Sequence, residues 1–162
     1  MSGITIRRAE RDDAERLHAA LLRLSADMGD THVAGLDDVI RHGFMEAPAF
    51  FALLAIRNSD GRTLGVLQAS PIFSTTRGGC GLYVSDLWVD GDTRGEGLGQ
   101  RLLAASLDLA PESWSPVFLR LAVYHDNPDA RRFYERLDFT PREGETVFDL
   151  RAPAFDKLRH RS

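Results

Sequence analysis

The residues best suited to bind a ligand lie in a glycine-rich segment in the middle of the chain. They follow an apolar stretch that ends at Val89, and they read Arg94, Gly95, Glu96, Gly97, Leu98, Gly99 and Gln100. Glycine tolerates positive φ and lets the backbone approach a ligand closely. The first N–H groups of a helix have no intrahelical acceptors, and the helix dipole is positive there. A helix that opens at this segment is therefore suited to bind phosphate through its backbone amides.

Three kinds of phosphate turn share this glycine content, and the spacing separates them. A P-loop requires Gly-Lys-Ser/Thr, but Gln100 follows Gly99. A dinucleotide fingerprint that starts at Gly95 requires its third glycine where Gln100 stands. The pattern R-x-x-G-x-G is filled by Arg94, Gly97 and Gly99. A solvated glycine-rich turn is the alternative, and the position between an apolar strand and an amphipathic helix favours the pyrophosphate turn.

A second motif follows the next apolar stretch. Asn127 and Pro128 predict the cap and the first turn of a helix. Phe133 and Tyr134 lie on the apolar face of that helix, where core packing is their ordinary role. The whole run has the form N-x-x-A-x-x-F-Y-E-x-x-x-F.

Together, the two motifs resemble the GCN5-related N-acetyltransferase (GNAT) superfamily. The resemblance implies that backbone amides of residues 94–100 hold the pyrophosphate of acetyl-CoA. It also implies that the preceding strand pairs through its backbone with the pantetheine arm. The cofactor-binding residues expected on this basis are Leu87, Trp88, Val89, Arg94, Gly95, Glu96, Gly97, Leu98, Gly99, Gln100 and Asn127.

In the same superfamily, the tyrosine at the position of Tyr134 often protonates the departing CoA thiolate. A free tyrosine has a pKa near 10 and a thiol has a pKa near 8.5, so Tyr134 is protonated at pH 7 and can donate to a nascent thiolate. One departure from the pattern is Asp138, where many relatives have glycine. We expect Asp138 to adopt a left-handed conformation or to end the helix in another way.

On the substrate side, Asp86 precedes the strand segment that is expected to bind pantetheine. Its carboxylate can attract a cationic amine and take its proton, directly or through water. The alternative is an ion pair with a nearby arginine. A looser resemblance to the diamine and thialysine acetyltransferases covers nearly the whole chain, but Ser85 stands where that branch typically has a second acid. Asp27 and Asp30 can supply carboxylates for a distal ammonium, or they are ordinary solvated residues.

The remaining reactive side chains, cysteine and histidine, are weaker candidates for a catalytic or metal-binding role. Cys80 lies in a glycine-rich stretch with no identifiable base, which favours a bystander over an acetylated nucleophile. His125 beside Asp126 is interpreted as an exposed strand end. The five histidines show no metal-ligand spacing, and we expect no metal site. They are His18, His32, His42, His125 and His160.

The hydrophobic period switches repeatedly between 2 and 3.6 residues, which predicts strands alternating with helices. The expected order is β-α-α-β-β-β-α-β-α-β. This is a mixed α/β (α+β) fold, and the resemblance implies the GNAT fold with a mostly antiparallel sheet of six to seven strands and about four helices. Strands are predicted near residues 4–6 and over 50–57, 63–74, 82–89, 117–123 and 145–151, with helices over 12–28, 37–42, 97–110 and around 130–137.

The length and composition indicate what kind of protein carries these motifs. The 162 residues predict a single domain over residues 1–162, and 43% hydrophobic with 27% charged residues is ordinary globular composition. The net charge of −4 disfavours a nucleic-acid partner. No apolar signal region or bilayer-length stretch is present, so we expect no membrane partner and a cytoplasmic location.

These observations predict an N-acetyltransferase that uses acetyl-CoA. The expected acceptor is a small primary amine, such as a polyamine, thialysine or a lysine-like molecule, which attacks the thioester directly in a ternary complex. Tyr134 and Asp86 are the expected catalytic residues, with Asp86 and Asp30 on the substrate side. The alternatives are a peptide or protein Nα-acetyltransferase and a non-catalytic acyl-CoA sensor. The resemblance also implies a homodimer.

Overall fold

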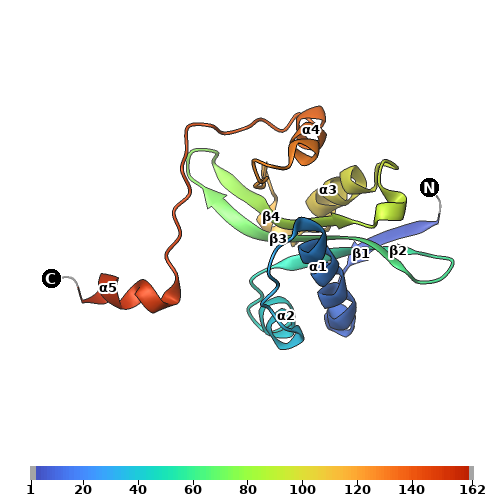
Figure 1. The fold of residues 1–162 in the computed structure, drawn as a ribbon, viewed down its shortest axis with the longest axis horizontal. Helices are drawn as coiled ribbons and strands as arrows, with labels where there is room; N and C mark the ends of the chain where they lie inside the picture. Colours follow the sequence, from blue (N-terminus) through green and yellow to red (C-terminus); the bar gives the residue numbers. More distant parts are fainter. Residues whose placement is uncertain (1–2, 161–162) are drawn as a thin grey trace. The chain divides into compact units, whose positions relative to one another are not determined.

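The computed structural model describes residues 3–160. The chain divides into two units, Met1–Ala122 and Val123–Ser162, and each is described by itself. The first unit is built on a five-stranded sheet whose strands follow one another in chain order (Figure 1). Its antiparallel strands are β1 (Ile4–Arg8), β2 (Phe51–Arg57), β3 (Thr63–Ser74) and β4 (Gly79–Val89), and β5 (Leu119–Arg120) pairs with β4 in parallel.

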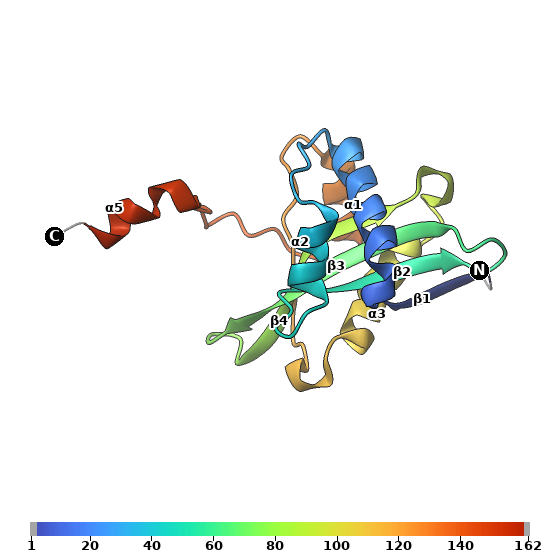
Figure 2. The same ribbon diagram turned by 90° about the horizontal axis from the view of Figure 1, so that it is seen from below.

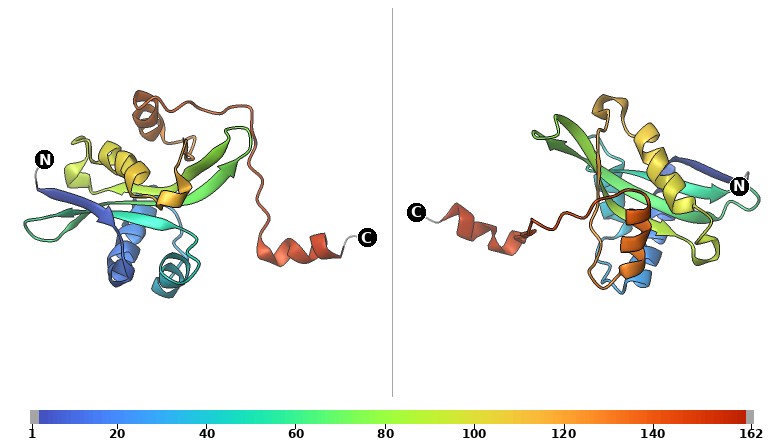
Figure 3. Two further views of the ribbon diagram at one scale, coloured as in Figure 1. Left: turned by 180° about the vertical axis from the view of Figure 1, so that it is seen from behind. Right: turned by 90° about the horizontal axis from the view of Figure 1, so that it is seen from above.

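Helices cover both faces of this sheet. α1 (Ala14–Met28) and α2 (Leu36–Gly43) lie on one face, and α3 (Leu98–Leu109) lies on the other (Figures 2 and 3). Because both faces are covered, the first five residues of β2 are all buried, and buried and exposed side chains do not alternate along them. Three short 3-10 turns complete the unit: η1 (Arg11–Asp13), η2 (Gly91–Thr93) and η3 (Glu112–Trp114).

The core has a layer on each side of the sheet. On the side of α1, the side chains of Leu17, Leu54 and Val66 are fully buried and belong to one cluster with Trp88. On the opposite side, α3 packs closely on β3. A Cβ added to Gly65 would come within 2.9 Å of Leu102 Cδ1, so the glycine lets this helix approach the strand.

The predicted elements of this unit are present with shifted ends. Gly29 ends α1 in the left-handed conformation, with φ of 71°. Strand β4 begins at Gly79 rather than at residue 82, because Gly79 and Gly81 lie within the strand instead of in a loop. A Cβ on either glycine would collide with the side chain of Val117 or Phe118, so these glycines allow the incoming chain to pack on the strand.

Strand β4 has two irregularities that shape its second half. Gln68 of β3 pairs with Asp86 and the next β3 residue pairs with Val84, so Ser85 is an extra residue that forms a β-bulge. On its other edge, β4 pairs with β5 only as far as Tyr83. Within the described residues, no strand pairs with this edge from Val84 onward, and the expected strand at 117–123 is reduced to the two residues of β5.

The loop between β4 and α3 is held by a buried carboxylate. Asp90 is only 5% exposed, and it accepts hydrogen bonds from the Asp92 amide at 3.0 Å and from Arg62 at 2.7 Å. Its main-chain carbonyl accepts from the hydroxyl of buried Thr93 at 3.1 Å. Burial alone would raise the pKa of the Asp90 carboxyl, but the amide and the guanidinium outweigh it and hold the pKa below its usual value.

Arg62 belongs to the β2–β3 hairpin, and the tip of that hairpin is itself anchored. Asn58 accepts a hydrogen bond from Thr5 at 2.8 Å, and the Gly61 carbonyl accepts one from Arg16 of α1 at 2.6 Å. Gly61 has a φ of 70°, which fits the predicted turn chemistry at residues 58–61. The hairpin therefore connects β1, α1 and the loop that precedes α3.

The second unit contains α4 (Pro128–Arg136), η4 (Ala152–Ala154) and α5 (Phe155–Arg159). The strand predicted over residues 145–151 is wrong, because this segment pairs with no strand of the described sheet. Val147 is 85% exposed and Phe148 is 90% exposed. Apolar, β-prone residues form a strand only where a neighbouring strand satisfies their backbone, and residues 145–151 pair with no described strand. Helix α5 was not predicted.

The mixed, mostly antiparallel α/β fold predicted from the sequence is confirmed, with five strands instead of six or seven. Five α-helices stand in place of about four among the described residues. None of these helices is long and apolar enough to cross a membrane.

We expect Asp90→Asn to lower the free energy of unfolding by about 1–3 kcal/mol at pH 7, because the buried charge that pairs with Arg62 is lost. The folded pKa of Asp90 is lowered, so its contribution is complete above the unfolded pKa of about 3.9 and is lost as pH falls through the folded pKa. The difference in stability between wild type and variant, measured by urea unfolding at several pH values, should therefore shrink in acid.

Asp92→Asn is the matched control. Its side chain is 78% exposed and reaches the same Arg62 only at 3.4 Å. This variant should change the unfolding free energy by less than about 0.5 kcal/mol. An equal loss in the two variants would contradict the central role of Asp90.

Candidate active site

The start of α3 has the properties of an anion site. Gly97 is the N-cap residue in the left-handed conformation, with φ of 77°, and no side chain caps the helix. Gly95 also has a positive φ of 85°. The first turn contains no acidic residue that would oppose the helix dipole. The first amides of α3 are thus left for an anion, and the two exposed glycines leave open space beside them.

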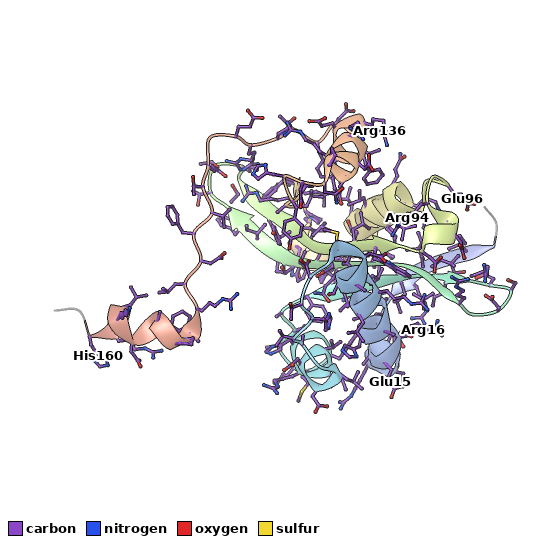
Figure 4. The ribbon with its side chains drawn as sticks, viewed as in Figure 1. Glu15, Arg16, Arg94, Glu96, Arg136 and His160 are labelled. Carbon is purple, nitrogen blue, oxygen red and sulfur yellow. The ribbon has the colours of Figure 1, made fainter. Side chains whose placement is uncertain are left out.

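The side chain of Arg94 belongs to the scaffold of this loop. Its Nε donates to the Val89 carbonyl at 3.1 Å, and its terminal nitrogen donates to Asp27 at 2.8 Å. Asp27 also accepts from the Trp88 indole at 3.0 Å. Figure 4 shows Arg94 and Glu96 beside the start of α3. The guanidinium therefore ties the loop to α1, while the Arg94 backbone remains part of the glycine-rich turn.

The free edge of β4 leads to this turn. Beyond Tyr83 no strand among the described residues pairs with that edge, so backbone groups between Val84 and Val89 are available to an extended, amide-containing arm. The Trp88 side chain is buried in the α1 layer, so any contact it makes with such an arm is through its backbone. An anion-binding helix start at the end of an open strand edge fits a molecule with a pyrophosphate and an amide-rich arm.

Asp86 lies directly after the bulge in β4. Its carboxylate accepts a hydrogen bond from Gln68 Nε2 at 3.1 Å. Burial raises the pKa of the Asp86 carboxyl, and this outweighs the lowering by the Ser85 hydroxyl and by positive charge on His32. The described residues place no arginine in an ion pair with Asp86, so the alternative interpretation from the sequence does not apply. A carboxylate with a raised pKa is a better proton acceptor near neutral pH.

The two acids at the end of α1 differ. Asp27 is engaged by Arg94 and Trp88, so this exposed carboxylate also belongs to the scaffold of the loop. The Asp30 backbone amide donates to the Ser25 carbonyl at 2.9 Å just after the helix. The role of Asp30 in binding substrate stays a prediction.

In the second unit, Asn127 starts α4 as predicted. Its side-chain oxygen accepts the Ala130 amide at 3.1 Å, and Pro128 occupies the first turn. Asp138 has a φ of 65°, so of the two alternatives expected there the structure has the left-handed conformation. The side-chain oxygen of Asn127 already serves as the helix cap. The contact of Asn127 with the cofactor stays a prediction.

Tyr134 packs edge-on against two aromatic rings, with centroids 5.0 Å from Phe133 and 5.4 Å from Phe139. Burial raises the pKa of Tyr134 to about 12. A raised pKa favours the protonated phenol, so the proton that an acid catalyst needs stays on the ring throughout the neutral and mildly alkaline range.

Three residues in this region were not predicted from the sequence. Asp90 precedes Gly91-Asp92, and an aspartate followed by a turn is a typical capping pattern that would have indicated it. Gln68 and His32 have no such signal, because they come near Asp86 only through strand pairing and through the path of the α1–α2 loop.

The remaining candidates have ordinary surroundings. Cys80 lies within β4, and its thiol donates to the Gly81 carbonyl at 3.4 Å rather than to a base. Among residues 3–160, no group of three histidine, cysteine, aspartate or glutamate side chains is arranged to hold a metal ion.

Comparison with known proteins agrees with this geometry. The chain is 28% identical over 155 residues to the peptidyl-lysine N-acetyltransferase YjaB of Escherichia coli, covering 93% of this chain and 91% of that protein. The structure is similar to an integron cassette protein from the Vibrio cholerae mobile metagenome, with a TM-score of 0.76 at 18% identity, covering 98% of this chain and 99% of that one.

A second similar structure is an aminoglycoside acetyltransferase from an uncultured soil metagenomic sample, crystallised with sisomicin. Its TM-score is 0.73 at 18% identity, and the match covers 93% of this chain and 97% of that one. At this level of identity, the two structures support the fold. The model of the acetyltransferase (GNAT) family matches residues 14–139, which include both motifs. The chain therefore belongs to the GNAT family of N-acetyltransferases.

Proposed function

We propose that this protein transfers an acetyl group from acetyl-CoA to a primary amine by direct attack in a ternary complex. The observation that carries the proposal is the uncapped start of α3, with left-handed glycines at 95 and 97, at the end of the open edge of β4. The GNAT family uses acetyl-CoA, and this arrangement fits its pyrophosphate and its pantetheine arm. Acetyl-CoA supplies the acetyl group as a reactive thioester.

The chain supplies binding, a proton acceptor and a proton donor. Backbone amides of residues 94–100 bind the pyrophosphate, and the backbone of Leu87, Trp88 and Val89 positions the arm. Asp86 attracts the ammonium and takes one proton from it, directly or through water, so that the neutral amine can attack the thioester carbonyl. The second proton leaves nitrogen for solvent as the tetrahedral intermediate collapses to the amide. Tyr134 donates its proton to sulfur as the C–S bond breaks. Because both substrates are held together, much of the rate comes from their orientation.

For the acceptor, we propose a primary alkylamine of the lysine type. The relative from Escherichia coli is named for acetylating peptidyl-lysine, and a similar structure is an aminoglycoside acetyltransferase. Both substrates present a primary amine that is protonated in water. Small free amines, including polyamines, thialysine and lysine, are tested beside a lysine peptide.

A screen of thiol release from acetyl-CoA over these amines, an aminoglycoside and a peptide with a free N-terminus tests the function. CoA release with any primary amine supports it. Acetyl-CoA binding without release by any member of the panel would instead indicate a non-catalytic acyl-CoA sensor.

We expect Gly97→Ala to weaken acetyl-CoA binding about tenfold. The left-handed φ of Gly97 costs an L-residue about 1–2 kcal/mol, and the open space beside it removes any steric explanation. Calorimetric titration with acetyl-CoA measures the effect. Gly91→Ala is the matched control, since Gly91 has equal space but no positive φ, and its affinity should match wild type.

We expect Tyr134→Phe to lower kcat at least about 100-fold while leaving acetyl-CoA affinity nearly unchanged, because only the acidic hydroxyl is removed from a packed ring. Since the pKa of Tyr134 is raised to about 12, wild-type kcat should not fall near pH 10 through loss of this proton. Tyr124→Phe, at a side chain that is 55% exposed, is the control. Near wild-type turnover of Tyr134→Phe would exclude its role as the acid.

We expect Cys80→Ala to keep full turnover, because direct attack needs no acetylated cysteine. Steady-state rates with varied amine and acetyl-CoA should also give intersecting rather than parallel lines. Loss of turnover in this variant, with parallel lines in wild type, would indicate a ping-pong mechanism through Cys80.

A further inference from the structure

Two unpartnered polar atoms belong to Gln68, which contacts Asp86, and to His32 in the loop after α1. Among the described residues, three buried side-chain nitrogen or oxygen atoms have no hydrogen-bond partner: His32 Nε2, Gln68 Oε1 and one terminal nitrogen of Arg101. Arg101 belongs to α3, and its other terminal nitrogen donates to the Ile4 carbonyl of β1. Of the residues that carry the other two atoms, Gln68 donates to the Asp86 carboxylate, and His32 is held by Ser25 of α1. A buried polar atom without a partner is costly, so each one calls for a physical explanation, of which a functional role is one.

The orientation of Gln68 is fixed by its neighbour. Gln68 is the β3 partner of Asp86, so the two side chains lie on the same face of the sheet. Its Nε2 donates to the Asp86 carboxylate at 3.1 Å. The reverse orientation would bring the amide oxygen against the carboxylate oxygen, which excludes it. Oε1 therefore remains as a hydrogen-bond acceptor beside Asp86.

The ring of His32 is also held in place. His32 lies in the loop between α1 and α2, and its Nδ1 is 2.8 Å from the Ser25 hydroxyl oxygen. Its ring packs edge-on against His18 with centroids 5.5 Å apart, and His18 in turn bonds the Ala34 carbonyl at 3.2 Å. One nitrogen of His32 is thus fixed by Ser25, and the other is buried and unpartnered.

These elements meet on the α1 face of the sheet. Side chains two residues apart on a strand share a face, so Asp86 lies on the same face as Trp88, which belongs to the α1 layer. The bond between Asp27 and the Trp88 indole anchors the end of α1 over this part of β4. The loop that carries His32 starts directly after this end of α1, and the contact of His32 with Ser25 holds the ring against the same last turns of the helix.

We propose that His32, Gln68 and Asp86 form the subsite that holds the reacting amine, with three acceptors for the three N–H groups of a primary alkylammonium. The acceptors are Gln68 Oε1, the Asp86 carboxylate and His32 Nε2, with the Nδ1 proton of His32 donated to Ser25. The subsite rests on the proposed function, because it binds the acceptor of that reaction. The subsite favours primary amines over N-methylated amines, because each N-methyl group removes one N–H donor and leaves one of the three acceptors without a hydrogen bond.

Two charge-matched probes test this selection. They are Nα-acetyl-lysine N-methylamide and its Nε-trimethyl derivative, titrated into the CoA-saturated full-length protein by calorimetry. Both carry one positive charge, but the second has no ammonium N–H. We expect the primary amine to bind at least about tenfold more tightly, because a site with buried acceptors rejects a ligand that lacks donors. Equal affinities would overturn the proposal.

Variants then assign the acceptors. Gln68→Met and His32→Asn should each weaken the primary amine about tenfold, with the affinity for CoA and for the trimethyl probe unchanged. Asparagine keeps a group near Nδ1 for Ser25, whereas His32→Gln extends an amide to the place of Nε2 and should recover binding to within about threefold of wild type. His42→Asn, at an exposed position in the last turn of α2, is the matched control.

The proposal is overturned if Gln68→Met and His32→Asn bind the primary amine like wild type, or if they weaken CoA equally. Because binding is measured without turnover, the two proposals fail separately. Selective amine binding without CoA release in the screen would contradict the transferase function, while the subsite proposal would still stand. CoA release in the screen, with no loss of amine binding in the Gln68 and His32 variants, would support the transferase function and contradict the subsite.

Discussion

The separation of β4 from β5 after Tyr83 is the constraint on which the rest of the site depends. At Leu82 and Tyr83, β4 has strand partners on both sides. Beyond Tyr83, β3 still holds β4 in register, while the opposite edge is available to a ligand. An edge of this kind normally invites aggregation. Here it is short, it is bent by the bulge at Ser85, and it ends at Val89, where the loop to α3 begins.

The scaffold around this edge is made largely of arginine–carboxylate contacts. Arg94 with Asp27 fixes the turn from the side of α1, and Arg62 with Asp90 fixes it from the side of the β2–β3 hairpin. Since Asp90 is buried and Asp27 is about half exposed, the two contacts differ in strength. The positive end of α3 is therefore held in place by side chains that do not themselves fill the anion site.

The sequence predicted the parts of the site that depend on local geometry. The spacing of Gly95, Gly97 and Gly99 indicated a helix start, because left-handed φ values and uncapped amides are properties of a few adjacent residues. Asn127 as a helix cap and Asp138 at positive φ were predictable for the same reason. Local pattern could not place His32 against Ser25 of α1, since that contact depends on how the loop after α1 folds back. The strand expected at residues 145–151 failed because a strand requires a partner edge, which alternation alone does not supply.

The anchored tip of the β2–β3 hairpin limits where this protein accepts added sequence. Hairpin tips are ordinarily the safest sites for inserting tags or fluorescent labels. At residues 58–61, however, an insertion would pull Asn58 from Thr5, Gly61 from Arg16 and Arg62 from Asp90. The tip between β3 and β4 has mainly local backbone bonds, such as that from Gly78 to Ser74. A reporter group is therefore better placed at residues 75–78, where it leaves the loop before α3 intact.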